Sequence, residues 1–509
     1  MSKIFERKYF VDYLLSGGGL FLLVLFIGKF YFLKELPLEL SYDESYYWDW
    51  SRHLDWGYYS KPPMVAWVIY VSSNLLGSTE WAVRLPALLF NTFTLALGYV
   101  MTSRFLGFST GRIFLFTLAF TPIFWIYSFV MTIDPPLLFF WTLSFYWFVR
   151  YIQKPNSLWA LLTGLAIGLG LLTKQTMFLF LPLGFLYCWL FERELLKKRE
   201  TLLIPTLSLL VYLPNFLWNV KRDFLLWEHT KAHFSRSAFS MDYYLLYFGG
   251  LLILFGVFFV PLFFELGFRF FKLIRLYLKG ALRELKEREE GTILKVLFCS
   301  YIFSFPPLFF ILVLSLFKKF NHNWIMPFFI TAYIWVSYLA MGHKFRKLLL
   351  YLNLLIGIFL SLLVIAVAKK PYIFPGEGGK ILAQTFYKFV GWKELAKEVS
   401  KVYDSSLPLL VSHREIASSL AFYLSEHPHP YVLNLENQIN NQYHLWRRDE
   451  ELIGREVLLV KKGSDIPSYI VKPQKLGEVV IEVGNKKKIY SIWRGIFFKG
   501  NIHLEDKKL

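Results

Sequence analysis

Long apolar runs separated by short polar turns dominate the first three quarters of the chain. A bilayer core needs roughly 20 apolar residues per helix, and most of the runs approach that length. They predict eleven membrane-spanning helices, near residues 13–33, 81–104, 112–130, 135–150, 157–172, 176–191, 201–219, 243–266, 294–317, 325–341 and 349–368. The chain is therefore predicted to be a polytopic α-helical membrane protein, with its fourth and fifth spans short enough to be broken or tilted.

The hydrophobic pattern changes after Lys369, where long runs give way to short ones. Strand-length apolar segments alternate there with helical patterns. We expect strands at 407–411, 431–435, 457–460 and 479–483, and helices at 391–403 and 415–424. This alternation predicts a small α/β domain over residues 369–509, following a transmembrane domain over residues 1–368.

Basic residues concentrate in every second loop between the predicted spans, and this asymmetry orients the chain. With a cytoplasmic N-terminus, the inner loops are 104–112, 150–154, 192–200, 269–295 and 343–347. The longest has basic residues at helical intervals over 269–288, which predicts an amphipathic helix on the anionic inner leaflet. The loop 34–80 and the α/β domain then lie outside, in the periplasm or its equivalent.

The composition supports a membrane protein and argues against other classes. Of the 509 residues, 55% are hydrophobic, and the mean hydropathy is +0.42. The net charge of +19 lies largely on loops between apolar spans, so it indicates topology and no nucleic-acid partner. Cys188 and Cys299 fall inside predicted spans, so no structural disulfide is expected. The chain also has no GxxxxGK[ST] phosphate loop, so ATP-driven transport is not indicated.

The loop 34–80 is longer and richer in charged and aromatic residues than a simple connection between two helices. Ser41 and Glu44 form a capping-box pattern, which predicts a helix running to about His53. That pattern gives Glu44 a structural role, and a catalytic role is the alternative. Asp43 shares a helical face with aromatic residues at i+3, i+4 and i+7. It is therefore expected near the membrane interface, as a general base or a sugar-binding group.

A lysine follows in the same loop, directly before two prolines that start the next helix. Lys61 is either a solvated loop residue or a cation that binds the phosphate of a lipid. Tyr58 and Tyr59 are either hydrogen-bond donors to that phosphate or interfacial anchors.

Two short outer turns carry further charges. Asp134 is explained either as the cap of the following helix or by chemistry. Lys174 is explained either by snorkelling to the interface or by phosphate binding. Because unpaired charge at membrane depth is costly, their position on the same side as Asp43 and Lys61 predicts one shared polar cavity.

Three further residues of predicted outer loops are candidates for the acceptor side: His322, Lys318 and Arg222. A lone histidine such as His322 is more often an interfacial residue than a ligand. No His, Asp or Glu spacing indicates a metal site, and no cofactor is required by the sequence. If a divalent cation does bind, Asp43 and Asp134 are its expected ligands.

The segments Tyr42–Trp48 and Tyr58–Pro63 resemble the first outer loop of polyprenyl-phosphate-sugar glycosyltransferases with the GT-C fold. The resemblance is to the group that includes the aminoarabinose and galacturonic-acid transferases of lipid A, and more distantly to the protein O-mannosyltransferases. The turns at Asp134 and Lys174 and the segment 441–446 also resemble this group.

The resemblance implies roles by position. Asp43 matches the carboxylate that the family places at the reacting centre. Lys61 and Tyr58 match the pair expected to hold the lipid-phosphate leaving group, with Lys174 as a second cation. Asp134 matches a second carboxylate beside the acceptor or a metal.

Two departures from the family pattern leave the sugar and the acceptor open. The predicted spans number eleven, against thirteen expected for the aminoarabinose enzymes, and Ser60 stands where an acidic or histidine neighbour is common.

The function implied is an inverting glycosyltransferase of the inner membrane. It would move one sugar from a polyprenyl (undecaprenyl) phosphate to a lipid A type glycolipid at the periplasmic face. Its expected partners are this donor, the glycolipid acceptor and membrane lipids. The alternatives are a protein O-mannosyltransferase-like enzyme and a lipid-linked sugar flippase or transporter. A flippase would give no reason for a large extracytoplasmic α/β domain.

Overall fold

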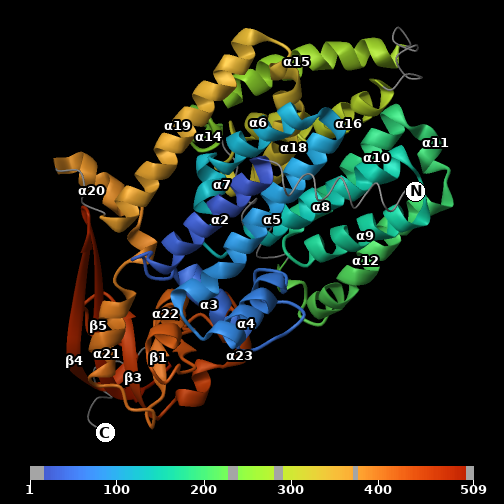
Figure 1. The fold of residues 1–509 in the computed structure, drawn as a ribbon. Coiled ribbons are helices and arrows are strands. Elements are labelled where there is room, and N and C mark those ends of the chain that lie inside the picture. The colour runs from blue at the N-terminus through green and yellow to red at the C-terminus, as the bar shows by residue number, and fades with distance from the viewer. Residues whose placement is uncertain (1–16, 227–238, 280–289, 371–375, 500–509) are drawn as a thin grey trace.

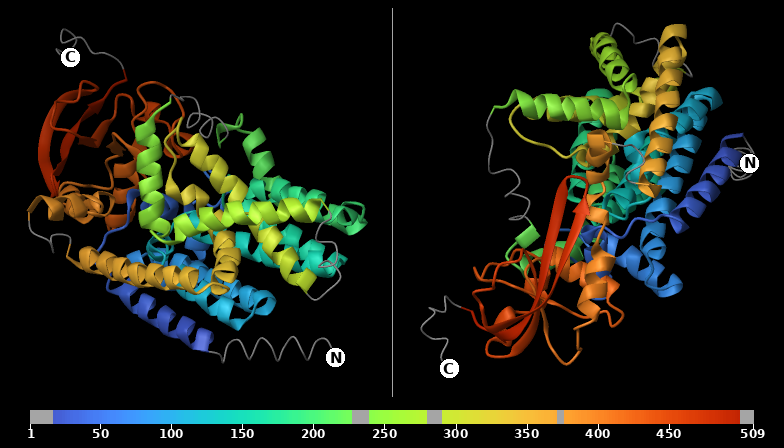
Figure 2. Two further views of the ribbon diagram at one scale, coloured as in Figure 1. Left: turned by 90° about the horizontal axis from the view of Figure 1, so that it is seen from above. Right: turned by 90° about the vertical axis from the view of Figure 1, so that its left-hand side faces the viewer.

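The computed structural model describes residues 17–226, 239–279, 290–370 and 376–499. Figure 1 shows a bundle of helices with a five-stranded sheet and its helices at one end. The loop after α2 (Gly17–Lys34) lies between the bundle and the sheet and contains α3 (Tyr42–Ser51) and α4 (Met64–Leu76). The turned views in Figure 2 show the same separation of sheet and bundle.

The remaining bundle elements follow in chain order. They are α5 (Glu80–Leu106), α6 (Phe108–Ala119), α7 (Pro122–Ile126), α8 (Asp134–Gln153), α9 (Ser157–Leu171), η1 (Gln175–Leu179), α10 (Phe180–Phe191), α11 (Arg193–Leu196), α12 (Arg199–Val220), α14 (Met241–Phe255), α15 (Phe259–Leu278), α16 (Glu290–Ile302), α17 (Phe305–Leu314), η3 (His322–Ile325), α18 (Met326–Met341) and α19 (Lys344–Lys369).

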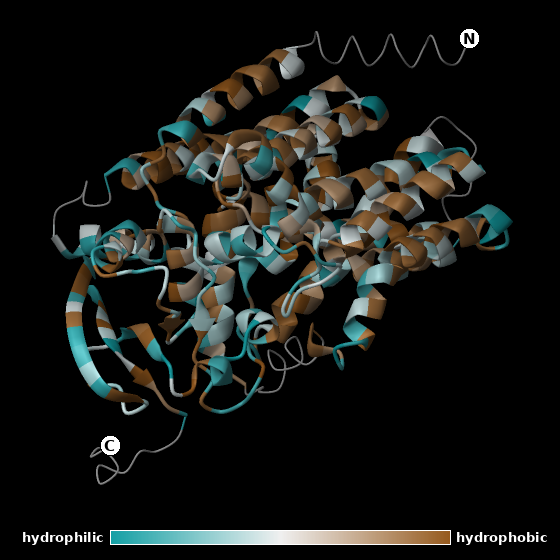
Figure 3. Cartoon of the chain, turned by 90° about the horizontal axis from the view of Figure 1, so that it is seen from below, coloured by the Kyte–Doolittle hydropathy of each residue, from teal (hydrophilic) through white to brown (hydrophobic). Residues whose placement is uncertain are grey.

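Helices occupy all eleven predicted ranges, but they differ in length and hydropathy. Within the described residues, six segments are long and apolar enough to cross a membrane: Gly17–Lys34, Glu80–Leu106, Arg199–Val220, Gly291–Leu314, His322–Met341 and Lys344–Lys369. A seventh results if α14 and α15 count as one bent span. Apolar residues dominate the bundle in Figure 3. The chain is thus polytopic, as expected, whereas the number eleven stays a prediction.

The chain bends by 103° between α14 and α15. Gly256 at the bend has a φ of +124°, and a Cβ there would overlap the amide of Asn353, so the bend requires glycine. Oδ1 of Asn353 accepts from two backbone N–H groups at the start of α15, at 3.3 and 3.2 Å, which lack partners within the helix. The helix predicted over 269–288 is confirmed as far as Leu278, and residues 280–289 lie outside the described part.

The C-terminal region is an α/β layer, as predicted. Its strand order is β2-β1-β3-β5-β4, with β1 parallel to β2 and β3, and β5 antiparallel to β3 and β4. The elements are α20 (Gly376–Gln384), η4 (Tyr387–Phe389), α21 (Trp392–Ser400), β1 (Leu409–Val411), α22 (Arg414–Tyr423), β2 (Tyr431–Val432), α23 (Tyr443–Trp446), η5 (Asp449–Leu452), β3 (Glu456–Lys462), β4 (Ile470–Val483) and β5 (Lys486–Phe497).

All four predicted strands and both predicted helices of this region are confirmed. The fifth strand, β5, was not expected from the sequence. It begins with three lysines, which interrupt the apolar pattern where β5 leaves the turn after β4.

A hydrophobic core joins the outer loop to the α/β region. Tyr46 and Trp50 of α3 pack in one buried cluster with Leu420 and Tyr443. The hydroxyl of Tyr443 also donates to Oδ2 of Asp49 at 2.7 Å. These contacts hold α3 between the bundle and the α/β region, and so they position the residues that α3 carries.

Candidate active site

Asp43 lies in the first turn of α3, and its side chain is 31% exposed. Nη2 of Arg414, the first residue of α22, lies 3.2 Å from Oδ1 of Asp43. Nζ of Lys388, in η4, lies 3.8 Å from Oδ2. The guanidinium of Arg414 also stands 4.9 Å above the ring of Tyr46. The ammonium of Lys388 likewise stands 5.0 Å from the ring of Tyr42. The α/β region thus supplies two cations that orient the carboxylate, each held over an aromatic ring.

Glu44, the adjacent carboxylate, is completely buried and has structural partners. The predicted capping box with Ser41 is confirmed. Nε and Nη2 of Arg84 lie 2.9 and 3.1 Å from its two carboxylate oxygens, and the N–H of Met131 donates to it at 3.0 Å. Because Glu44 is fully engaged in holding α3 against α5, folding alone explains it.

Lys61 is half-buried, and its ammonium makes no hydrogen bond or ion pair among the described residues. Its charged neighbours are Lys174, Asp134, Asp43 and Arg414. Burial, followed by the charge of Lys174, lowers the pKa of Lys61 to about 8, against the opposing effect of the two carboxylates. A partly desolvated cation without a fixed counter-ion is suited to bind an anionic group.

Local folding brings the Lys61 turn to the Lys174 turn. The N–H of Tyr58 donates to the carbonyl of Lys61 at 3.0 Å, which closes the turn. The N–H of Met64, the first residue of α4, donates to the carbonyl of Leu172 at 3.0 Å. Proline at 62 and 63 has no N–H to offer, so Met64 is the first residue after Lys61 able to make this connection.

Asp134 and Lys174 form a buried ion pair, with 2.7 Å between Oδ1 and Nζ and side-chain exposures of 3% and 9%. Oδ2 of Asp134 accepts from Nδ2 of Asn323 at 2.9 Å and from the hydroxyl of Thr132 at 3.2 Å. Asp134 is the first residue of α8 and makes no capping hydrogen bond, so the capping explanation is wrong. The snorkelling explanation of Lys174 is also wrong, because its ammonium is buried against a carboxylate.

The structure therefore brings the four predicted charged residues into one cluster. Tyr47 is buried beside both carboxylates of this cluster. Burial, then the charge of Asp43, raises the pKa of this tyrosine, and the charge of Asp134 adds to the effect. The cluster contains two more cations than carboxylates: Lys61, Lys174, Arg414 and Lys388 against Asp43 and Asp134. An anion is the ligand that this excess favours.

The two tyrosines proposed as phosphate ligands are placed differently. The hydroxyl of Tyr58 is buried and shares its one proton between the carbonyls of Trp50 and His53, at 3.1 and 3.0 Å. Its ring stacks on Trp50 at 4.5 Å. These bonds shape the loop and occupy the hydroxyl of Tyr58, so we assign it no contact with the phosphate. Tyr59 is half-buried, and its N–H donates to Oε1 of Gln442 at 2.7 Å.

The three acceptor-side candidates are less central. A ring nitrogen of His322, Nε2, lies 2.9 Å from the carbonyl oxygen of Tyr247, and the two rings stack at 4.8 Å. Arg222 forms a 3.4 Å ion pair with Asp55 of the outer loop. Lys318 is half-buried after α17. None of the three is among the charged neighbours of Lys61.

A metal site is the remaining expectation. Over the described ranges, no group of three or more His, Cys, Asp or Glu side chains is arranged to hold a metal ion. The expected ligands Asp43 and Asp134 each face cationic side chains. A divalent ion at either carboxylate would lie beside those cations, and their like charge disfavours it.

The sequence did not point to several residues of the cluster. Arg414 reaches Asp43 across 371 positions of the chain, and Asn323 reaches Asp134 across 189. Neither lies in a recognisable motif. In this segment the sequence offers His322 as the candidate, whereas the neighbouring Asn323 makes the contact with Asp134.

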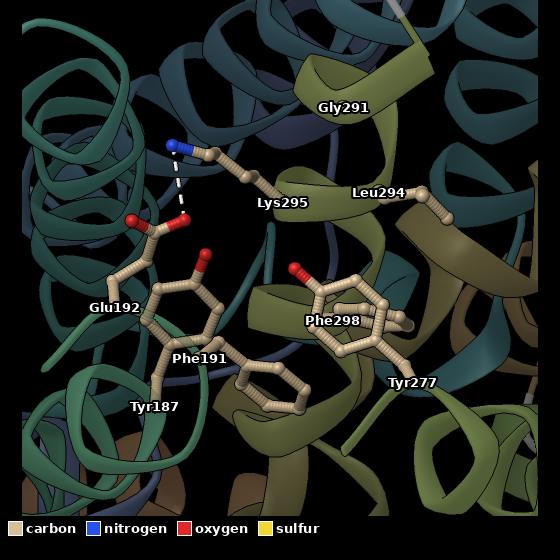
Figure 4. A pocket seen from close by; sticks show the side chains of 8 residues that line it. All are labelled: Tyr187, Phe191, Glu192, Tyr277, Gly291, Leu294, Lys295 and Phe298. Atoms are coloured by element: carbon tan, nitrogen blue, oxygen red, sulfur yellow. Dashed lines mark ion pairs between the residues drawn. The ribbon is translucent and has the colours of Figure 1, made fainter. Parts of the chain in front are cut away.

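A small cavity at the other end of the bundle, away from the sheet, has no connection to this cluster (Figure 4). Its volume is about 10 Å³, room for about one water. Glu192 and Lys295 form an ion pair of 2.9 Å in its wall, and the rest of its lining is largely aromatic. The pair joins α16 to the end of α10, so a structural role explains it.

Comparisons with known proteins support the family resemblance. Residues 60–218 match the family described as dolichyl-phosphate-mannose-protein mannosyltransferase. The lipid A galacturonosyltransferase RgtD of Rhizobium johnstonii is 32% identical over 241 residues, 46% of this chain and 49% of that protein. The lipopolysaccharide core galacturonosyltransferase RgtA of the same organism is 29% identical, over 40% of this chain and 42% of that protein. The matches thus span about half the length of these relatives or less.

A solved structure resembles this chain over nearly its whole length. The crystal structure of ArnT from Cupriavidus metallidurans bound to undecaprenyl phosphate covers 94% of this chain and 98% of its own, with a TM-score of 0.58 and 15% sequence identity. At this identity the likeness concerns the fold. It confirms the expected GT-C type of architecture with a C-terminal α/β region.

Proposed function

We propose that this chain, whose residues 60–218 match the dolichyl-phosphate-mannose-protein mannosyltransferase family, is a membrane glycosyltransferase. Its donor is a sugar on a polyprenyl phosphate, and its acceptor is a glycolipid of the lipid A type. The reaction takes place at the Asp43–Lys61 cluster, on the periplasmic side of the inner membrane. Residues 1–368 form the membrane-embedded catalytic domain, and residues 369–509 form the periplasmic domain that completes the site.

The observation that carries this proposal is the ammonium of Lys61, which is unpaired among the described residues and lies beside four charged groups that are paired. Lys174 is largely neutralised by Asp134, so it adds less positive charge to the site than the sequence suggested. Lys61 is therefore the cation available to a phosphate. Its place at the start of α4, close to the apolar bundle, suits a phosphate whose polyprenyl chain lies in the membrane.

The chemistry is a displacement at the anomeric carbon. The acceptor oxygen forms a bond to that carbon while the bond to the phosphate oxygen breaks, with inversion. The polyprenyl phosphate leaves with one more negative charge than it had in the donor. Lys61 stabilises that charge, which is larger in the transition state than in the ground state. The buried Asp134–Lys174 pair fixes the turn next to it.

Asp43 acts on the acceptor side. If the acceptor is a hydroxyl group, Oδ2 of Asp43, which lies 3.8 Å from Lys388, accepts its proton as the new bond forms. If the acceptor is a phosphate group, no proton has to leave, and Asp43 orients the sugar instead. Arg414 and Lys388 hold the carboxylate in either case, and because they belong to the α/β region, that region is part of the site.

The relatives guide the choice of sugar and acceptor. RgtD is named as a lipid A galacturonosyltransferase and RgtA as a lipopolysaccharide core galacturonosyltransferase. We therefore assign a galacturonic-acid donor and a lipid A acceptor as the first pair to test. A protein acceptor is the second candidate, because the matched family is named for protein mannosyltransferases.

Transfer in proteoliposomes tests the proposal. Purified full-length protein is mixed with a polyprenyl phosphate galacturonate and lipid A, and the lipid product is measured by mass spectrometry. The expected product is lipid A with one added hexuronate and free polyprenyl phosphate. Unchanged lipid A together with glycosylated protein would favour the second candidate. Movement of the donor between leaflets without any product would favour a flippase.

A further inference from the structure

A second cavity lies at the opposite end of α3 from Asp43. Its volume is about 170 Å³, and its walls come from the end of α3 and from the α/β region: Asp49, His53, His429, Pro430, Tyr443, Trp446 and Arg447. Asp43 and Asp49 are six residues apart on one helix, roughly 9 Å along its axis. The mechanism above uses none of these lining residues.

The two histidines in this cavity have defined proton positions. Nη2 of Arg52 lies 2.8 Å from Nε2 of His429. A guanidinium can only donate, so Nε2 of His429 accepts and its ring proton is on Nδ1. That Nδ1 lies 3.3 Å from Nε2 of His53, so His429 donates to His53. Both rings are therefore neutral and hydrogen-bonded in series from Arg52.

The cavity wall has more positive than negative charge. Arg52 is paired with Asp49 at 3.0 Å. Arg447 makes no ion pair within the described part of the chain; it donates to the carbonyl of His429 at 3.3 Å and stands 5.0 Å from the ring of Tyr431.

The pKa values of two side chains in the cavity wall reflect this excess of positive charge. Burial, then Arg52, His53 and Arg447, lowers the pKa of His429 to about 4. Burial raises the pKa of Asp49 to about 6, although Arg52, the hydroxyl of Tyr443 and nearby His427 all act in the opposite direction. Burial is the largest cause of both shifts and disfavours the charged form of each group, whereas Arg52 lowers both pKa values, as an excess of positive charge does.

An aromatic face completes the cavity. Trp446 is half-buried next to Arg447, and its ring lies 4.7 Å from that of His53. A flat apolar ring beside hydrogen-bonding groups suits a sugar, which has an apolar face and a polar edge. A guanidinium beside it suits a phosphate or carboxylate, because its fork of N–H groups can bind two oxygens at once.

From these contacts we infer that this cavity binds an anionic saccharide, a sugar carrying a phosphate or a carboxylate. Arg447 and the His53–His429 pair hold the anionic group, and Trp446 packs against the ring. This cavity would then bind a distal part of the glycolipid acceptor, a role that rests on the function proposed above. The binding of an anionic saccharide is independent of that function.

Calorimetry on the full-length protein in detergent tests the site, with glucose 6-phosphate, glucuronate, glucose and inorganic phosphate as probes. We expect both anionic sugars to bind, glucose not to bind, and inorganic phosphate to bind more weakly than glucose 6-phosphate. Arg447→Ala should weaken glucose 6-phosphate binding by about 10-fold or more. Equal binding of inorganic phosphate and glucose 6-phosphate would overturn the saccharide assignment.

Two variants make the result specific. Arg455→Ala removes an exposed arginine of the same region that does not line the cavity, and it should bind as the wild type does. Lys61→Ala should also bind normally, so a failure of sugar transfer is distinguishable from a failure of this site. Unchanged binding in Arg447→Ala would overturn the inference.

Proton uptake gives a second readout. A bound anion favours the charged form of His53 or His429, so at pH 6 binding should take up protons. Heats measured in two buffers of different ionisation enthalpy count those protons. His429→Gln, which keeps a hydrogen-bonding side chain, should reduce the uptake. Binding without any proton uptake would contradict the assignment of the anionic group to the histidine pair.

Discussion

Nζ of Lys174 lies 2.7 Å from Oδ1 of Asp134, and the pair is almost completely buried. Asp134 begins α8 and Lys174 lies in the turn after α9, and each taken alone has an ordinary structural explanation. The pair shows that neither explanation holds. It joins these turns next to Lys61, whose ammonium has no counter-ion among the residues that the structure describes.

Breaking this pair from one side should destabilise the protein more than removing both charges. Lys174→Met leaves a buried carboxylate with only Asn323 and Thr132, and a buried pair broken in this way costs about 3–5 kcal/mol. Asp134→Asn leaves a buried ammonium, with a similar effect. Thermal unfolding in detergent should show the double variant to be more stable than the sum of the single changes predicts. Strictly additive losses would show that the pair is not coupled.

Sugar transfer should depend on pH through Lys61. The cation is the active form, and its pKa is about 8, so kcat/KM should fall as the pH rises through about 8. Lys61→Arg keeps its charge at every accessible pH, so its residual activity should lose this fall. An identical fall in Lys61→Arg would show that another group is responsible.

Rising pH should affect folding stability through Lys61 in the opposite direction to sugar transfer, which falls. Its pKa in the folded protein is about 8, below the ordinary value of 10.5. Between these two values the unfolded chain binds more protons, so the contribution of Lys61 to stability becomes more favourable as the pH rises through that window. Chemical denaturation of wild type and Lys61→Met should differ less at pH 10 than at pH 7. A difference that grew with pH would contradict the burial of this ammonium.

Asp43→Asn separates the two kinds of acceptor. With a hydroxyl acceptor, loss of the general base should lower kcat by about 10²–10⁴-fold. With a phosphate acceptor, the loss should be about 10-fold or less, because no proton is transferred. Initial rates of transfer at saturating donor measure this. Full activity in Asp43→Asn would remove Asp43 from the site.

Glu44→Gln should act on stability. It leaves the buried guanidinium of Arg84 without its carboxylate, at a cost of about 3–5 kcal/mol. The control is Glu436→Gln, at an exposed position of the α/β region, which should change stability by less than about 0.5 kcal/mol. If Glu44→Gln unfolded normally but had lost transfer, Glu44 would be a catalytic residue after all.

Local patterns account for what the sequence predicted well. The capping box at Ser41, the start of α4 after two prolines, and four of the five strands are set by neighbouring residues, and the structure has all of them. β5 is the strand that the sequence does not predict. Its antiparallel pairing with β3 and β4 depends on residues that are distant in the chain, and local patterns do not show such pairing.

The site was predictable in part for the same reason. Asp43, Lys61, Asp134 and Lys174 stand out because a charge close to a membrane needs an explanation. Arg414 does not stand out, because an arginine at the start of a helix in an α/β region is ordinary. Its importance comes from the packing of α22 against α3, which brings together residues 371 positions apart. The partners that orient Asp43 were therefore beyond sequence reasoning.

In the proposed mechanism, Lys61 stabilises the departing polyprenyl phosphate. The most direct test of this role is single-turnover transfer in proteoliposomes by the wild type, Lys61→Ala and Lys397→Ala, the last at an exposed lysine of α21. All three proteins should be folded, as judged by thermal unfolding. We expect Lys397→Ala to match the wild type and Lys61→Ala to be slower by about 10²–10³-fold. Equal rates for Lys61→Ala and the wild type would contradict the account.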